Sequence, residues 1–267
     1  MANTLDTAAN QPAPTASGPL VGHRGLSHYY PENTRASIDG AITAGLYGVE
    51  VDLRSSRDGV PFLVHDVRLK RIAGDPRRVD ELDAIDLSTI AMNYQPEEPL
   101  GLSTPPFVTS FEAAYTPRAD ALRWFAEIKF DPRCVDEVAR IWREHPPLAG
   151  SACMSFDRAL CRRARAALPS TVLVARIHQE SFEGGPLQEA IIEQVVADRL
   201  DAIALWHRHV DPAWVKMAHD AGLQVFAWTV NERESVDAML RAKVDIIMSD
   251  GPAEILSCFG RTPPSDS

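Results

Sequence analysis

Short apolar runs alternate with helix-patterned stretches along most of this chain, and this alternation restricts the fold more than any other feature of the sequence. Continuous apolar runs of this length are typical of buried strands, and strands that alternate with helices indicate a parallel sheet. The eight predicted strands are Leu20–Gly22, Gly48–Leu53, Arg123–Ile128, Ala152–Ser155, Thr171–Ala175, Ala202–Leu205, Gln224–Ala227 and Asp245–Met248.

The clearest helical patterns lie between these runs, at Thr34–Ala44, Pro132–Glu144, Asp157–Leu168, Leu187–Ala197, Asp211–Ala221 and Glu232–Ala242. Asp211 and Asn231 are typical helix N-caps, and Gly222 marks a helix stop before a strand. A single (β/α)8 barrel commonly takes about 250 residues, which suits a chain of 267 residues. An open doubly wound sheet is the alternative, but no G-x-G-x-x-G motif follows the first predicted strand. We therefore predict one α/β TIM barrel.

One interval, at about residues 66–111, interrupts the alternation because it is too long for a βα loop. It contains Gly74–Pro76, several charged residues and a proline-rich piece at 96–106. The run Phe62–Val64 just before it suits a short extra strand. We interpret the interval as an insertion after the second strand on the C-terminal face of the barrel, where long inserts often shape a substrate mouth. Below we call residues 66–111 the insertion.

The two ends of the chain lack hydrophobic periodicity. Residues 1–17 are rich in Ala, Pro, Thr and Asn, and residues 261–267 form a short polar segment. We expect a disordered leader and a disordered tail on either side of a barrel domain at residues 18–260.

Composition bears on the partners and the compartment. The net charge is −10, so the attraction to phosphates that drives non-specific nucleic-acid binding is absent, and we expect no nucleic-acid partner. No apolar run approaches the ~20 residues of a transmembrane segment, and the leader lacks the basic and apolar regions of a secretory signal. No pair of the four cysteines has C-x-x-C spacing, which indicates free thiols in a reducing compartment. These features predict a cytoplasmic protein.

Carboxylates concentrate on the second and third predicted barrel strands. Glu50 and Asp52 are two residues apart and therefore share one face of their strand, as do Glu127 and Lys129 on theirs. Barrel active sites lie at the C-terminal ends of the strands, so these side chains should meet at the mouth. Such a pattern alone also suits a rim cluster or an ion pair. Burying so much charge at one rim is costly without partners, however, and oxygen ligands suit Mg²⁺ or Ca²⁺.

Histidines extend this polar group. His23 and Arg24 end the first predicted strand, and His65 with Asp66 follows the run that leads into the insertion. A single histidine is usually structural. Two histidines at the same end of the barrel as the carboxylates, Arg24 and Lys129 are harder to explain by structure alone, because burying charge is costly without partners.

The order of these motifs resembles the signature of the glycerophosphodiester phosphodiesterase family. The matching motifs are His23-Arg24-Gly25, Pro31-Glu32-Asn33-Thr34, Glu50-x-Asp52, Asp58-Gly59, His65-Asp66, Glu127-x-Lys129, Ser155-Phe156, Trp228-Thr229-Val230-Asn231 and Ser249-Asp250-Gly251-Pro252. They extend from about Val21 to Pro252, and the residues expected to act on the substrate are all present. The resemblance therefore implies an active enzyme.

The resemblance also implies roles for the central residues. Glu50, Asp52 and Glu127 would bind one divalent cation, Mg²⁺ or Ca²⁺. His23 and His65 would form the acid/base pair that exchanges protons with the substrate.

Other residues would surround this centre. Arg24 and Lys129 would face the phosphate oxygens, and Trp228 would line the pocket for the glycerol end of the substrate. Glu32 and Asn33 would support Arg24 and the metal ligands, although their loop also opens the first helix.

The implied reaction is hydrolysis of a small-molecule glycerophosphodiester to sn-glycerol 3-phosphate and an alcohol. The nucleophile is either water or the glycerol 2-hydroxyl, which would give a cyclic phosphate first. A lysophospholipase D, or a phosphodiesterase for sugar or opine substrates, would share the same residues and differ in its pocket. A binding module without chemistry is a third possibility, against which the intact His23 and His65 argue. The sequence leaves the alcohol, the metal and the oligomeric state open.

Overall fold

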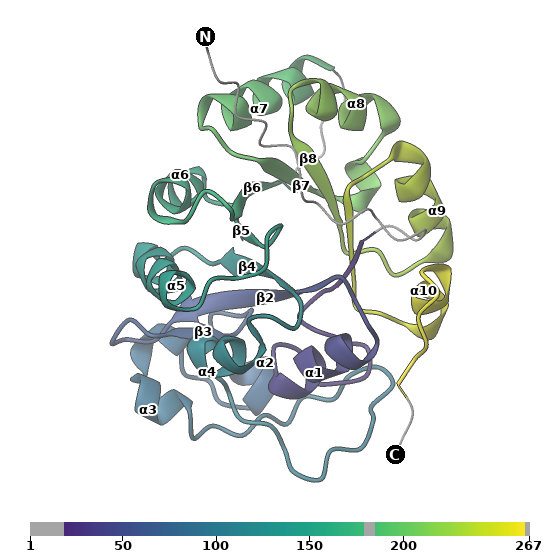
Figure 1. Ribbon diagram of the computed structural model, residues 1–267. Coiled ribbons are helices and arrows are strands. Elements are labelled where there is room, and N and C mark those ends of the chain that lie inside the picture. Colours follow the sequence, from purple (N-terminus) through teal and green to yellow (C-terminus); the bar gives the residue numbers. More distant parts are fainter. Residues whose placement is uncertain (1–18, 179–184, 265–267) are drawn as a thin grey trace.

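Eight parallel strands form a closed ring, because the first strand pairs with both the second and the last. The computed structural model describes residues 19–178 and 185–264. The strands of the ring are β1 (Leu20–Gly22), β2 (Gly48–Ser55), β4 (Arg123–Ile128), β5 (Ala152–Ser155), β6 (Leu173–His178), β7 (Ala202–Trp206), β8 (Gln224–Trp228) and β9 (Ile246–Ser249). The predicted (β/α)8 barrel is confirmed (Figure 1).

Helices surround the ring and follow its strands (Figure 1). They are α1 (Arg35–Thr43), α4 (Phe111–Tyr115) with the 3-10 turn η2 (Thr116–Arg118), α5 (Pro132–Glu144), α6 (Arg158–Ala167), α7 (Gly185–Ala197), α8 (Pro212–Asp220), α9 (Arg233–Ala242) and α10 (Ala253–Cys258). A further 3-10 turn, η3 (His207–His209), follows β7. Thr34 caps α1 by accepting a hydrogen bond from the Ser37 amide, and Asp211 caps α8 through the amides of Ala213 and Trp214.

Alternation along each strand sends one set of side chains into the barrel and the other toward the helices. Phe125 and Phe226 meet edge to face inside the barrel, with ring centroids 5.7 Å apart. Gly48 leaves room for this layer, since a Cβ there would lie 2.8 Å from the Phe125 ring. The next inward positions on β2 and β4 are Glu50 and Glu127. The apolar layer therefore closes the barrel beneath these carboxylates.

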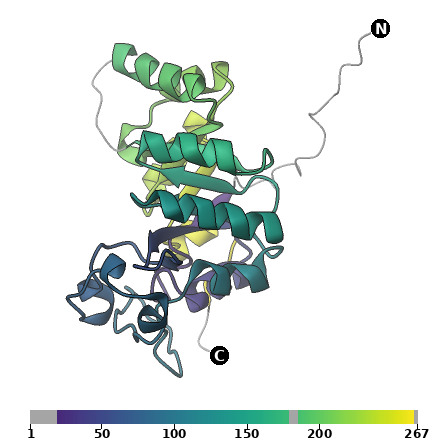
Figure 2. The same cartoon turned by 90° about the vertical axis from the view of Figure 1, so that its left-hand side faces the viewer.

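The insertion packs around a cluster of its own and lies beside the barrel (Figure 2). Its entry strand β3 (Pro61–Leu63) pairs antiparallel with the end of β2, one residue earlier than the predicted extra strand. The insertion itself contains α2 (Lys70–Ala73), η1 (Val79–Glu81) and α3 (Ala84–Leu87). The Glu98 amide donates to the His28 carbonyl, which ties the later part of the insertion to the loop after β1.

Two local predictions are wrong. The fifth predicted strand was expected at Thr171–Ala175, but the Val172 amide donates to the Pro169 carbonyl in a turn, and the ladder of β6 begins only at Leu173. Asn231 does not cap α9, because the cap position belongs to Glu232. The helix stop at Gly222 is confirmed by its left-handed φ of 78°.

Several other expectations concern the ends of the chain and the cysteines. The predicted leader, residues 1–17, lies outside the described residues, and so do residues 265–267 of the predicted tail. Residues 261–264 have no regular secondary structure. The four cysteines are free, as predicted. Among the described helices, none is both long and apolar enough to cross a membrane.

Gly25 is required where the chain turns from β1 toward α1. Its φ is 86°, and an added Cβ would lie 2.3 Å from the Ser37 hydroxyl and 2.6 Å from the Ser37 backbone. We predict that Gly25→Ala lowers the free energy of unfolding by ~3 kcal/mol, from the left-handed backbone and the forced overpacking together. Urea unfolding measures this loss.

Gly222→Ala is the matched control, because Gly222 is also left-handed but has open space around it. We expect it to cost only about 1 kcal/mol. Equal losses for the two variants would contradict a steric requirement at Gly25.

Candidate active site

Three buried carboxylates meet at the barrel mouth. Glu50 and Asp52 come from β2 and Glu127 from β4, where Asp52 and Glu127 are direct neighbours across the sheet. One oxygen of each lies within 4.8 Å of the other two, and none of the three residues is more than 8% exposed. The structure thus brings together the trio that the sequence singled out, and a set of carboxylate oxygens suits a hard divalent cation.

The protein alone does not balance the charge of this trio. Burial and the neighbouring Asp52 raise the pKa of Glu50 to about 8, and the same two causes raise the pKa of Glu127. Burial opposes ionisation of Asp52 too, but Lys129 and Arg24 hold its pKa below the usual range. The Lys129 ammonium that pairs with Glu127 is shared with Asp52, so one cation serves two carboxylates. An added cation would therefore fit the trio and stabilise its ionised form.

Two cationic side chains border the trio. The Lys129 ammonium lies 2.9 Å from Asp52 Oδ1 and also contacts Glu127. The Arg24 Nε lies 3.2 Å from Asp52 Oδ2, while the Arg24 amide donates to Glu50 Oε2 at 2.9 Å. Both predicted phosphate-facing residues thus lie against the carboxylates.

The loop before α1 fixes these groups in place. The Asn33 amide group donates to Asp52 Oδ2 at 2.9 Å, and its carbonyl accepts the Asp52 backbone amide at 3.0 Å. Glu32 accepts from Arg24 Nη1 at 3.1 Å. Both residues therefore contact the groups that they were predicted to support.

Each candidate histidine has its own aspartate. His23 Nδ1 lies 2.7 Å from Asp250 Oδ1, and His65 Nδ1 lies 2.7 Å from Asp66 Oδ1. The His23 Nε2 points toward the trio, 3.9 Å from Glu50 Oε2. A carboxylate on Nδ1 fixes the ring and leaves Nε2 to exchange a proton.

The pKa values of the two histidines are shifted in opposite directions. Burial lowers the pKa of His23, but Asp250 and Glu50 outweigh it and the pKa is raised. Burial also lowers the pKa of His65, and there the repulsion from Arg24 and Lys129 adds to burial, so the pKa stays below its usual value. The surroundings therefore favour a protonated His23 and a neutral His65.

Sequence reasoning gave no role to two residues that hold this pair. Asp250 receives hydrogen bonds from Ser27 at 3.0 Å and from Asn231 at 2.5 Å besides its contact with His23. Its motif was recognised, and a carboxylate at the end of the last strand is a signal for a partner on the first. Arg71 of α2 donates to Glu32 and Asp66, but nothing in the sequence separates it from the other arginines of the insertion.

Trp228 is the last residue of β8, and it packs against the apolar cluster inside the barrel. Its ring meets Phe156 edge to face at 5.8 Å, and the Phe156 ring is 6.0 Å from the Lys129 ammonium. The buried Trp228 Nε1 has no hydrogen-bond partner in the described part of the chain. The two rings form an aromatic pair beside Lys129.

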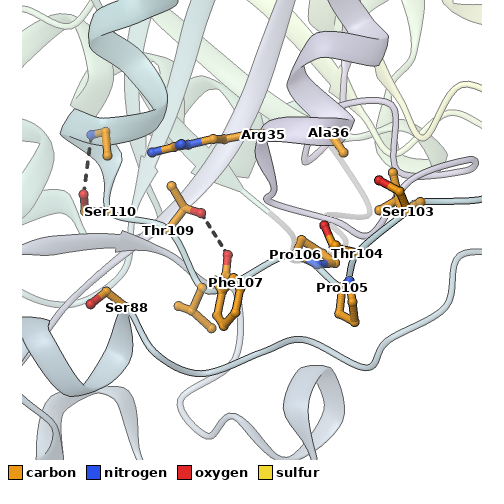
Figure 3. A pocket seen from close by; sticks show the side chains of 13 residues that line it. Arg35, Ala36, Ser88, Ser103, Thr104, Pro105, Pro106, Phe107, Thr109 and Ser110 are labelled. Atoms are coloured by element: carbon orange, nitrogen blue, oxygen red, sulfur yellow. Dashed lines mark hydrogen bonds between the residues drawn. The ribbon is translucent and has the colours of Figure 1, made fainter.

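A separate cavity of about 480 Å³ lies between the start of α1, α4 and the proline-rich part of the insertion (Figure 3). Arg35, Phe107 and Thr109 are among the residues that line it. None of the candidate catalytic or metal-binding residues does so, and we assign the cavity no part in the reaction.

With this geometry in view, comparison with known proteins identifies the family. Residues 23–254 match the model of the glycerophosphoryl diester phosphodiesterase family. The chain belongs to this family. The match begins at His23 and extends past Asp250, so it spans every candidate residue of the site.

Several known proteins resemble the chain along most of its length. The glycerophosphodiester phosphodiesterase 1 of Bos taurus is 28% identical over 242 residues, which cover 79% of this chain and 71% of the relative. A glycerophosphodiester phosphodiesterase from Thermotoga maritima has a TM-score of 0.70 at 24% identity, covering 87% of this chain and 94% of that one. A phosphodiesterase of Oleispira antarctica, solved with its product sn-glycerol-3-phosphate, has a TM-score of 0.76 at 20% identity, covering 91% and 97%. These two structures support the barrel fold.

The raised pKa of Glu50 predicts how stability depends on pH. A carboxyl with a raised pKa binds more protons in the folded than in the unfolded state, so its contribution is present at low pH and is lost as pH rises from about 4.5 toward 8. In chelator, the free energy of unfolding should therefore fall over this range by ~1 kcal/mol or more beyond the fall seen in Glu50→Gln. Urea unfolding at several pH values measures the difference.

A divalent cation should remove this loss, raising Tm more at pH 8 than at pH 5 in the wild type. Identical pH slopes for wild type and Glu50→Gln in chelator would contradict the charge imbalance inferred for the trio.

Proposed function

We propose that this protein hydrolyses glycerophosphodiesters to sn-glycerol 3-phosphate and an alcohol, with Glu50, Asp52 and Glu127 holding one Mg²⁺ or Ca²⁺ ion. The observation that carries the proposal is the buried carboxylate trio with two histidines near it, each held by its own aspartate. Membership of the family supports it, as does the product bound by the Oleispira antarctica relative.

In this proposal His23 and His65 exchange the two protons of the reaction. Phosphodiester hydrolysis needs a proton removed from the entering oxygen and another given to the leaving one, at opposite apices of the phosphorus. His65 favours the neutral form and so accepts the proton of the entering hydroxyl. His23 favours the protonated form and so donates to the leaving alkoxide. Asp66 and Asp250 hold the Nδ1 atoms while this occurs.

Charge on the phosphoryl oxygens has to be neutralised as the reaction proceeds. A bound cation supplies positive charge at this place. Arg24 and Lys129 lie against the same carboxylates and add their own charge to the phosphate side of the pocket. Trp228 would cover the glycerol end of the substrate, and Glu32 and Asn33 keep Arg24 and Asp52 oriented.

We extend the proposal to the organisation of the chain and its place in the cell. Residues 18–260 would form the catalytic domain, with the insertion contributing to the substrate mouth. A cytoplasmic location is supported by the four free cysteines, three of which are buried.

Metal dependence and substrate choice can be tested together. We predict that EDTA abolishes turnover and that Mg²⁺ or Ca²⁺ restores it, because the ionised trio is unfavourable without a cation. A panel of glycerophosphodiesters and lysophospholipids, assayed for glycerol 3-phosphate and alcohol release, identifies the preferred substrate. Full activity after thorough chelation would contradict the metal site, and products other than glycerol 3-phosphate would contradict the reaction.

Replacing either histidine should lower kcat by ~10²-fold or more, the usual scale for a proton-transfer group. Metal affinity should change little, because the carboxylates hold the ion. The pH–rate profile of the wild type should be bell-shaped, with limbs that belong to the pair.

A nitrophenyl ester separates the two roles, since its leaving group needs little protonation. His23→Ala should recover much of its lost rate on this substrate and His65→Ala should not. Rescue of His65→Ala instead would reverse the assignment, and near wild-type turnover by both variants would refute it.

A further inference from the structure

One arginine of the insertion reaches the rim of the barrel. Arg71 uses three different nitrogens: Nη1 and Nη2 donate to the two oxygens of Glu32 at 2.8 and 2.7 Å, and Nε donates to Asp66 Oδ2 at 2.7 Å. The Tyr94 ring lies over the guanidinium, 5.3 Å from its carbon. A planar guanidinium held along two edges and covered on one face has a single orientation.

The contact with Asp66 leads to one candidate histidine. The two carboxylate oxygens of Asp66 have different partners. Oδ1 accepts a hydrogen bond from His65 Nδ1, and Oδ2 accepts one from Arg71 Nε. Asp66 is partly exposed, and a carboxylate with one partner could rotate away. With Arg71 on the second oxygen, the carboxylate is fixed, and so is the tautomer of His65 that carries its proton on Nδ1.

The contact with Glu32 leads to the other side of the site. Glu32 is 5% exposed, and its Oε1 accepts from both Arg71 and Arg24. Two guanidinium groups thus share one buried carboxylate, and Arg24 in turn lies 3.2 Å from Asp52. Without Arg71, Glu32 would keep Arg24 as its remaining cation and could tilt toward it.

We propose that Arg71 is a positioning residue that couples the insertion to both halves of the site, holding His65 through Asp66 and Arg24 through Glu32. This inference rests on the proposed function for its catalytic consequence. The insertion then does more than border the substrate mouth, because its docking on the barrel sets the orientation of a proton-transfer group and of a phosphate-facing group. A lysine could not replace Arg71, since one ammonium cannot span the two carboxylates in this fork geometry.

The test compares Arg71→Ala and Arg71→Lys with Arg77→Ala. Arg77 is the matched control because it lies in the same insertion and pairs only with Asp75 among the described carboxylates. We expect Arg71→Ala to lower kcat by ~10- to 100-fold, the scale found when the groups that orient active-site ligands are removed. Arg71→Lys should not recover the rate. Guanidinium added at a non-denaturing concentration should partly restore turnover to Arg71→Ala and to neither of the other variants. The loss of kcat in Arg71→Ala should persist at temperatures well below the Tm of that variant.

A readout independent of activity follows the His65 ring itself. In ¹⁵N NMR spectra the wild type should show the Nδ1–H tautomer of His65, and Arg71→Ala should show a mixture of tautomers. If the wild type turns over no glycerophosphodiester, the proposed function fails and the NMR comparison alone decides the role of Arg71. An unchanged His65 spectrum would overturn the inference. So would a kcat within twofold of wild type, or a loss of kcat that only follows a loss of Tm.

Discussion

The cost of burying three carboxylates at one end of a barrel governs the rest of this site. Glu50, Asp52 and Glu127 are close to fully buried above an apolar layer that keeps water out from below. Removing carboxylates from water is unfavourable unless positive charge and hydrogen bonds replace the lost hydration. The cations and hydrogen bonds at the mouth supply part of that replacement, and a divalent cation held by the trio would complete it.

The backbone at the mouth also bears strain to bring these partners in. Arg24, Asn33 and Phe130 all have left-handed φ, at 58°, 57° and 47°. Such conformations cost about 1–3 kcal/mol each in residues other than glycine and persist only where the surroundings enforce them. Arg24 and Asn33 use theirs to contact the carboxylates, and Phe130 directly follows Lys129. The other two described residues of this kind, Arg199 and Lys243, follow the helices α7 and α9 and have no part in the mouth.

Local patterns predicted the barrel and the trio because both depend on simple periodicity. Alternation along a strand places Glu50 with Asp52, and the parallel order of strands places Glu127 beside them. The role of Asp250 could have been inferred, because a carboxylate at the end of the last strand lies beside the first strand once the barrel closes. The role of Arg71 could not, since its partner Glu32 lies 39 residues away and only the fold brings the two together. Asn231 was misassigned for a related reason. Its position before a helical pattern is typical of an N-cap. The closed barrel instead brings it beside Asp250, and its side-chain amide donates a hydrogen bond to that carboxylate.

The central claim is that the buried trio is a single cation site placed between His23 and His65. Crystals soaked with Mn²⁺, a divalent stand-in for Mg²⁺, would locate the ion directly by its anomalous scattering. The account predicts one strong peak within coordination distance of Glu50, Asp52 and Glu127, with Lys129 beside the ion and not in its place. A trio that binds no ion while Lys129 keeps its contacts, or a peak at some other carboxylate group, would contradict it.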